Sequence, residues 1–209
     1  MAQRLRACTG CHGADGRAAN DGYYPRIAGK PAGYLFRQLR AFRDGRRPYA
    51  PMSRLLAPLS DDYLREIAAH FAALDLPYAP RPPARADAAT LRRGQTLARQ
   101  GDAARELPAC QACHGAALTG AGDDVPGLLG LPVDYLNAQL GAWRTGARRA
   151  EAPDCMAQIA QRLSEQDVNA LAHWLAARPV PADAKAAADV PQPLPLRCGS
   201  IIGAKDVAR

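Results

Sequence analysis

Two copies of one short pattern contain four of the six cysteines and two of the four histidines of this chain. The copies read Cys8-Thr-Gly-Cys11-His12 and Cys110-Gln-Ala-Cys113-His114. This C-x-x-C-H pattern is the signature of c-type haem attachment. Two thiols about one helical turn apart reach the two vinyl groups on one porphyrin edge, while the adjacent imidazole turns onto the iron. We therefore predict two covalently bound haems, with His12 and His114 as iron ligands.

Two other chemistries use the same residue types. Two C-x-x-C pairs can ligate one zinc ion, but such pairs usually lie ~15 to 20 residues apart, whereas Cys8 and Cys110 are 102 positions apart. A thioredoxin-like dithiol requires one C-x-x-C pair and does not account for a histidine directly after each pair. Haem attachment explains both the pairs and the histidines.

Methionine is scarce, which narrows the choice of a second axial ligand. Besides the initiating residue, the chain contains only Met52, 40 residues after His12, and Met156, 42 residues after His114. Methionine also fills hydrophobic cores, but these two residues occupy the equivalent point of each half. We predict that each of them binds iron.

The two halves share more than this spacing. Residues 25–39 align with residues 126–140, and both segments read Pro-x-(Ile/Leu)-x-Gly followed by Tyr-Leu-x-x-Gln-Leu. After the methionines, residues 59–64 align with residues 163–168. The chain is therefore a tandem duplication. Its predicted divisions are a first domain at 1–80, a linker at 81–87, a second domain at 88–178 and a Pro- and Ala-rich tail at 179–209.

Helical periodicity predicts the elements that position these residues. Apolar residues at helical spacing occur within 34–42 and within 64–74, and a run at 91–100 predicts a helix before the second motif. Ser60 and Ser164, each followed by an acidic residue, predict helix N-caps. The methionines lie in segments that contain Ala-Pro, for which we predict loops. His70 and His173 compete with the methionines as ligands, but they lie in the predicted final helices at non-equivalent positions.

In combination these motifs resemble the di-haem cytochromes c of the cytochrome c4 group, over residues 8 to about 176. The resemblance implies an all-α fold of two tandem class I cytochrome c domains, each wrapped around one covalently bound haem. It implies that Cys8, Cys11, His12 and Met52 hold one haem and that Cys110, Cys113, His114 and Met156 hold the other. It also implies that the carbonyls of Pro25 and Pro126 accept a hydrogen bond from the proximal imidazoles.

The resemblance further implies an electron-transfer protein of the bacterial periplasm, not an enzyme. Histidine and methionine together fill both axial positions, so no site for substrate remains on the iron. The partners implied are a terminal oxidase, a cytochrome bc1-type complex or a dehydrogenase catalytic subunit. Three functions stay open: a carrier that passes electrons toward a terminal oxidase, the cytochrome subunit of a multi-subunit dehydrogenase, and a di-haem peroxidase. The peroxidase requires an open sixth site.

Charge is unevenly distributed along the chain. The formal charge of +7 divides into +5 over 1–80, +4 over 81–105, −3 over 106–180 and +1 over the tail. No apolar stretch reaches the ~18 residues of a membrane span, so only peripheral membrane association is expected. No nucleic-acid-binding motif is present, and nucleic acid is not an expected partner. A row of arginines at 37, 40, 43, 46 and 47 is either a docking face for an acidic partner or a solvated face that also pairs haem propionates.

Cys155 and Cys198 remain outside the two motifs. In an oxidising compartment, an even number of remaining cysteines favours a disulfide. That disulfide would tie the tail to the segment beside Met156. Two free thiols are the alternative. The sequence also lacks the apolar region of a signal peptide, and the first repeat has no counterpart of the helix at 91–100. We expect the recorded start to lie downstream of the native one, or the chain to have been trimmed.

Overall fold

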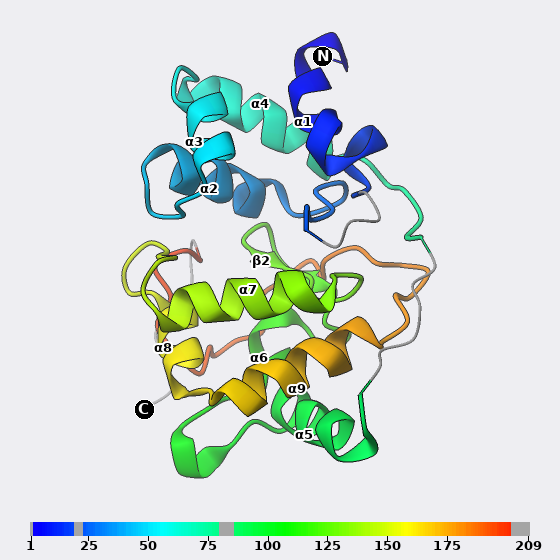
Figure 1. The fold of residues 1–209 in the computed structure, drawn as a ribbon, viewed down its shortest axis with the longest axis vertical. Helices are drawn as coiled ribbons and strands as arrows, with labels where there is room; N and C mark the ends of the chain where they lie inside the picture. The colour runs from blue at the N-terminus through cyan, green and yellow to red at the C-terminus, as the bar shows by residue number, and fades with distance from the viewer. Residues whose placement is uncertain (1, 19–22, 80–85, 202–209) are drawn as a thin grey trace.

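A computed structural model describes residues 2–18, 23–79 and 86–201. Its helices form two bodies, one from each half of the chain (Figure 1). The predicted linker at 81–87 falls largely outside the described residues, as does the end of the predicted tail from residue 202. In the described ranges no helix is long and apolar enough to cross a membrane. The elements are η1 (Ala2–Leu5), α1 (Arg6–His12), η2 (Ala14–Gly16), α2 (Ala32–Arg43), α3 (Ala50–Leu56), α4 (Asp61–Ala72), α5 (Ala88–Arg99), η3 (Ala103–Arg105), α6 (Gln111–His114), β1 (Gly120–Ala121), β2 (Val125–Pro126), α7 (Val133–Arg144), α8 (Cys155–Arg162) and α9 (Glu165–Ala176).

The first body packs around the contact between α2 and α4. Their apolar stripes meet in a core that includes Leu35, Leu64 and Phe71, none of them more than 7% exposed. The predicted N-cap of α4 is confirmed, because the Ser60 hydroxyl accepts a hydrogen bond from the amide of Tyr63, the third residue of the helix. Leu5, in the 3-10 turn ahead of the first motif, packs into the same core. This short leading segment supplies packing that a full helix supplies in the second body.

The second body is built on a close crossing of α5 and α9. The helix predicted at 91–100 is confirmed as α5, and Gly94 lies at the crossing point. A Cβ atom at Gly94 would lie 2.2 Å from the Ala170 carbonyl oxygen and 2.6 Å from the Trp174 Cβ. Leu97 and Leu171 extend the contact into a core that also receives α7. Any larger residue at position 94 would therefore push the two helices apart.

A buried carboxylate ties α9 to α5 and to the segment that follows α5. Asp167 is 3% exposed and accepts hydrogen bonds from Arg93 Nε at 2.8 Å and Arg105 Nη1 at 2.7 Å. It also completes a capping box with Ser164, which confirms the second predicted N-cap. Burial opposes ionisation, but these donors outweigh it, so the pKa of Asp167 lies well below its usual range.

We expect Asp167→Asn to destabilise the second body by about 2 kcal/mol at neutral pH, because it removes the buried carboxylate that Arg93 and Arg105 share and leaves them only Asp102 as a counter-charge. Since the folded-state pKa is lowered, this stabilisation is complete above the unfolded-state pKa of about 3.9 and is lost as the pH falls through the folded-state value. Denaturant unfolding at neutral and acidic pH measures the difference. Asp62→Asn, at an exposed carboxylate that pairs with Arg65, is the control. A destabilisation independent of pH would contradict the electrostatic origin.

The structure corrects one prediction about the methionine segments. Both were predicted to be loops, and this is wrong, because Met52 lies in α3 and Met156 lies in α8. Pro51 occupies the first turn of α3, where the missing proline N–H removes no helical hydrogen bond. Asp154 caps α8 by accepting a hydrogen bond from the Ala157 amide at 3.0 Å. The all-α prediction is confirmed apart from the two-residue antiparallel pair of β1 and β2.

The chain after α9 returns along the second body. The Ala187 amide donates to the Gly120 carbonyl at 3.0 Å, which adds a parallel bridge to the edge of β1. Further on, Leu194 is only 2% exposed. The structure contains a disulfide between Cys155 and Cys198, at the first residue of α8. The tail is therefore fastened beside Met156.

Candidate haem site

A cavity of about 1010 Å³ lies where the two bodies meet. Its volume is at the upper end of the ~300 to 1,000 Å³ typical of a site for one small ligand, and apolar side chains form most of its wall. Neither His70 nor His173 is among the described residues that line it. All eight predicted cofactor-binding residues do line it: Cys8, Cys11, His12, Met52, Cys110, Cys113, His114 and Met156.

The two motif histidines have the same surroundings in both halves. Each is 8% exposed. His12 Nδ1 lies 2.9 Å from the Pro25 carbonyl oxygen, and His114 Nδ1 lies 2.8 Å from the Pro126 carbonyl oxygen. A carbonyl only accepts, so Nδ1 is the protonated nitrogen and Nε2 is the one with a lone pair for a metal. Burial lowers the pKa of His114, which favours the neutral imidazole that a metal requires.

A glycine follows each motif histidine and turns the chain toward these prolines. Gly13 has φ 76° and ψ 170°, and Gly115 has φ 80° and ψ 153°. This region of backbone conformation is essentially restricted to glycine. A Cβ atom at Gly115 would also lie 2.8 Å from the Gly120 carbonyl oxygen. The glycine after the histidine therefore belongs to the geometry of the motif.

The four motif thiols fit an apolar cofactor better than a metal or redox site. None of them is bonded to another. Burial raises the pKa of Cys110 to about 12 and also raises the pKa values of Cys8 and Cys113. Redox dithiols have lowered pKa values instead. Within the described residues, no group of three or more His, Cys, Asp or Glu side chains is arranged to hold a metal ion.

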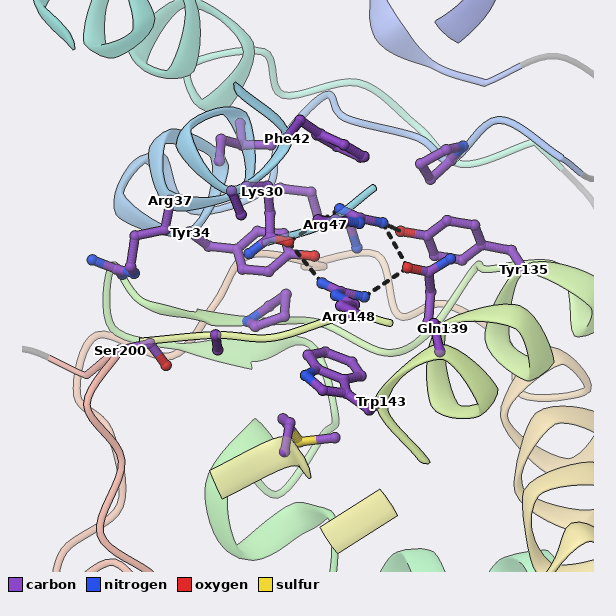
Figure 2. Close-up of a pocket in the computed structure, with 18 of the residues that line it drawn as sticks. Lys30, Tyr34, Arg37, Phe42, Arg47, Tyr135, Gln139, Trp143, Arg148 and Ser200 are labelled. Atoms are coloured by element: carbon purple, nitrogen blue, oxygen red, sulfur yellow. Dashed lines mark hydrogen bonds between the residues drawn. The ribbon is translucent and has the colours of Figure 1, made fainter. Parts of the chain in front are cut away.

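Equivalent arginines and glutamines from the two repeats meet between the bodies (Figure 2). Gln38 Oε1 accepts from Arg47 at 3.0 Å and from Arg148 at 2.7 Å. Gln139 Oε1 accepts from both arginines at 2.7 Å, and the Tyr135 hydroxyl accepts from Arg47 at 2.9 Å. Each guanidinium also lies over an aromatic ring of its own domain: Arg47 over Phe42 and Arg148 over Trp143. The network has the symmetry of the repeat.

This network is positively charged and lies in the wall of the cavity. Arg47 is 9% exposed and Arg148 is 4% exposed. Burial, together with Arg47, lowers the pKa of Arg148 to about 10. Neither arginine forms an ion pair with a carboxylate in the described part of the chain, although buried charges are normally paired. Haem propionates are the anions that would fit these cations, so the donor set suits the cofactor that the motifs predict.

The remaining arginines of the predicted row do not form a free face. Arg37 pairs across the domain interface with Asp124. Arg43 pairs with Asp61 at 2.7 Å, and Arg40 and Arg46 lie 3.7 Å and 3.6 Å from Glu151 in the second body. Their charges are largely compensated within the chain. The docking-face interpretation therefore stays a prediction, whereas Arg37, Arg40 and Arg46 join the two bodies.

Comparison with known proteins agrees with this geometry. Residues 91–178 match the family model for cytochrome c. The chain is 38% identical to the thiosulfate dehydrogenase electron acceptor of Thiomonas intermedia, with 83% of this chain and 79% of that protein covered. It is 34% identical to cytochrome c4 of Pseudomonas aeruginosa, with 82% and 84% covered. The chain belongs to the cytochrome c4 family. In this family it is a di-haem electron-transfer protein of two class I cytochrome c domains with covalently bound haem c.

A solved structure extends the comparison. The thiosulfate dehydrogenase of Marichromatium purpuratum aligns with a TM-score of 0.73 and 40% identity over 82% of this chain. Our chain spans only 36% of that protein. The similarity therefore covers one part of a larger protein.

Sequence reasoning overlooked part of the site. Gln38 and Gln139 were visible in the repeat alignment, and Arg47 and Arg148 also occupy equivalent positions, each two residues after the aligned glycines at 45 and 146. Polar residues at equivalent positions of the two repeats were therefore the signal from which the network could have been predicted. Lys30 also lines the cavity, but the repeat gave no such signal for it, because its counterpart is the apolar Leu131.

Proposed function

We propose that the chain carries electrons between redox proteins through two haems held in the cavity between its domains. Cys8 and Cys11 would attach one haem and Cys110 and Cys113 the other. His12 with Met52, and His114 with Met156, would be the axial ligands. The observation that carries this proposal is that one continuous cavity is lined by both complete ligand sets. Bound haem supplies the one-electron couple.

The protein contributes position, exclusion of water and charge. Pro25 and Pro126 fix the imidazole tautomer through the Nδ1 hydrogen bonds. Arg47 and Arg148 would hold propionates at the domain interface, and the apolar wall would keep water from the iron. The domain division at 1–80 and 88–178 follows from this assignment, because each range contains one full ligand set.

We propose the bacterial periplasm as the location, since the Cys155–Cys198 disulfide requires an oxidising compartment. A dehydrogenase is the partner that the relatives favour, because the Thiomonas relative is named as the electron acceptor of thiosulfate dehydrogenase. The cytochrome subunit of a dehydrogenase is thus the second candidate function. A free carrier would instead have a bc1-type complex as its electron donor and a terminal oxidase as its electron acceptor.

The ligand assignment is tested with Met52→Ala and Met156→Ala in the holoprotein. Each variant is expected to lower the potential of one haem and to open one iron to carbon monoxide, because methionine raises the potential and fills the sixth site. Redox titration and carbon monoxide spectra measure both effects, and each variant is the control for the other. Carbon monoxide binding or peroxide turnover by the unmodified protein would favour the di-haem peroxidase instead.

The partner is tested by mixing the oxidised holoprotein with a thiosulfate dehydrogenase and thiosulfate. We expect fast reduction of both haems, seen as growth of the ferrous absorption bands. Thiosulfate without the dehydrogenase is the control. Reduction at the same rate without the dehydrogenase would contradict this partner.

A further inference from the structure

Lys30 reaches from the first domain into the second. It lies in the short turn that precedes α2, and its Nζ donates a hydrogen bond to the Gly127 carbonyl at 3.2 Å. The side chain lines the cavity and is 6% exposed. Figure 2 shows it between the two bodies, in the region that also contains Arg47 and Arg148. Its ammonium group is therefore enclosed in the wall of the haem site.

The part of the chain that the structure describes gives this buried charge no counter-charge. Among the described residues, no carboxylate forms an ion pair with Lys30. Burial, with a contribution from Arg26, lowers the pKa of Lys30 to about 8, so the amine still holds its proton at neutral pH. Burial of an unpaired cation is unfavourable. The charge is therefore retained against a cost in stability.

The repeat shows that the fold of this turn does not require a charge. Leu131 occupies the position of Lys30 in the second domain, with the same Gly before it and the same Pro after it. Leu131 is buried as well, at 8% exposed. The same turn thus forms with an apolar side chain at this position. What distinguishes Lys30 from its counterpart is its charge and the group that it contacts.

The contact lies next to the second iron ligand. Gly127 directly follows Pro126, whose carbonyl accepts the hydrogen bond from His114 Nδ1. The Lys30 ammonium therefore binds the carbonyl of the residue next to the one that holds the proximal histidine of the second domain.

We propose that Lys30 is a positioning residue for electron transfer, which raises the reduction potential of the second haem and so draws electrons toward the second domain. The inference rests on the proposed function, because it requires a haem on His114. A fixed positive charge stabilises the ferrous state, which carries one positive charge fewer than the ferric state. The step is a one-electron transfer in which no bond forms or breaks.

The test is a redox titration of the holoprotein with Lys30→Gln and Lys30→Leu. Glutamine can still donate to the Gly127 carbonyl, whereas leucine is the residue that the repeat uses. Both should lower the potential of the second haem and shift the electron distribution between haems by about tenfold, since a buried charge acts strongly at short range. For a one-electron couple, tenfold corresponds to 59 mV. The methionine variants above assign each potential to its domain.

Controls separate charge from structure. Lys30→Arg keeps the charge and should keep the potential of the second haem. Lys185→Gln removes an exposed cation, 70% accessible, that pairs with Asp75, and should change neither potential. Unchanged potentials in Lys30→Gln, or equal shifts of both haems, would overturn the role of Lys30. A wild-type protein without two titrating His/Met haems would instead overturn the proposed function.

Discussion

Replacing Cys110 and Cys113 together by alanine is expected to leave a chain that carries one haem instead of two. Without the two thioethers the cofactor is held by axial bonds alone, and the second domain loses covalent retention of its largest apolar group. Leu131, Leu136 and Leu175 line the cavity as well as the core, so an empty site exposes them to water. The expected loss of stability is several kcal/mol, as for large cavities in hydrophobic cores.

The reciprocal change, Cys8→Ala with Cys11→Ala, is the matched control. It should remove the other haem and leave the second domain folded. Haem absorbance per chain, mass of the intact protein and the helical circular dichroism signal measure the outcome. Retention of two covalent haems in either double variant would contradict the assignment of the motifs.

Much of the fold was predictable because the repeat made each expectation testable within the chain itself. Helical stripes, the Ser60 and Ser164 caps and the leading helix of the second domain are local patterns, and the structure has all of them. The methionine segments failed because the Ala-Pro pair was weighed as a loop signal. Proline in a first helical turn is equally compatible with a helix.

The sequence predicted which residues bind the haems, but not which residues of the two domains contact one another around them. The motifs named the residues that meet at the cavity, since covalent haem attachment demands a fixed spacing. The contact of Arg148 with Gln38 spans 110 positions of sequence, and the contact of Lys30 with Gly127 spans 97. No local pattern encodes such contacts. They depend on how two folded domains pack, which composition and periodicity do not specify.

Removal of the Cys155–Cys198 disulfide is expected to destabilise the second domain by about 4 kcal/mol, from the entropy of closing a loop of this length. The two cysteines are 43 positions apart. Only noncovalent contacts of the tail, among them the Ala187 bridge to β1 and the buried Leu194, would then remain. Denaturant unfolding of Cys155→Ala with Cys198→Ala, compared with the parent holoprotein, measures this loss. Reduction of the parent protein with a thiol reagent should reproduce it.

The same change reaches the iron, because Cys155 is the first residue of α8 and Met156 is the second. Freeing the tail removes the covalent anchor from the turn that carries this ligand, and the Gly199 amide loses its fixed place against the Pro153 carbonyl. We expect weaker methionine ligation in the second domain, seen as partial loss of the far-red band of methionine-bound ferric haem. The first domain has no such anchor among its described residues, so its methionine band is the internal control. A double variant with undiminished bands and the parent unfolding free energy would show that the tail only covers the domain and does not hold its ligand.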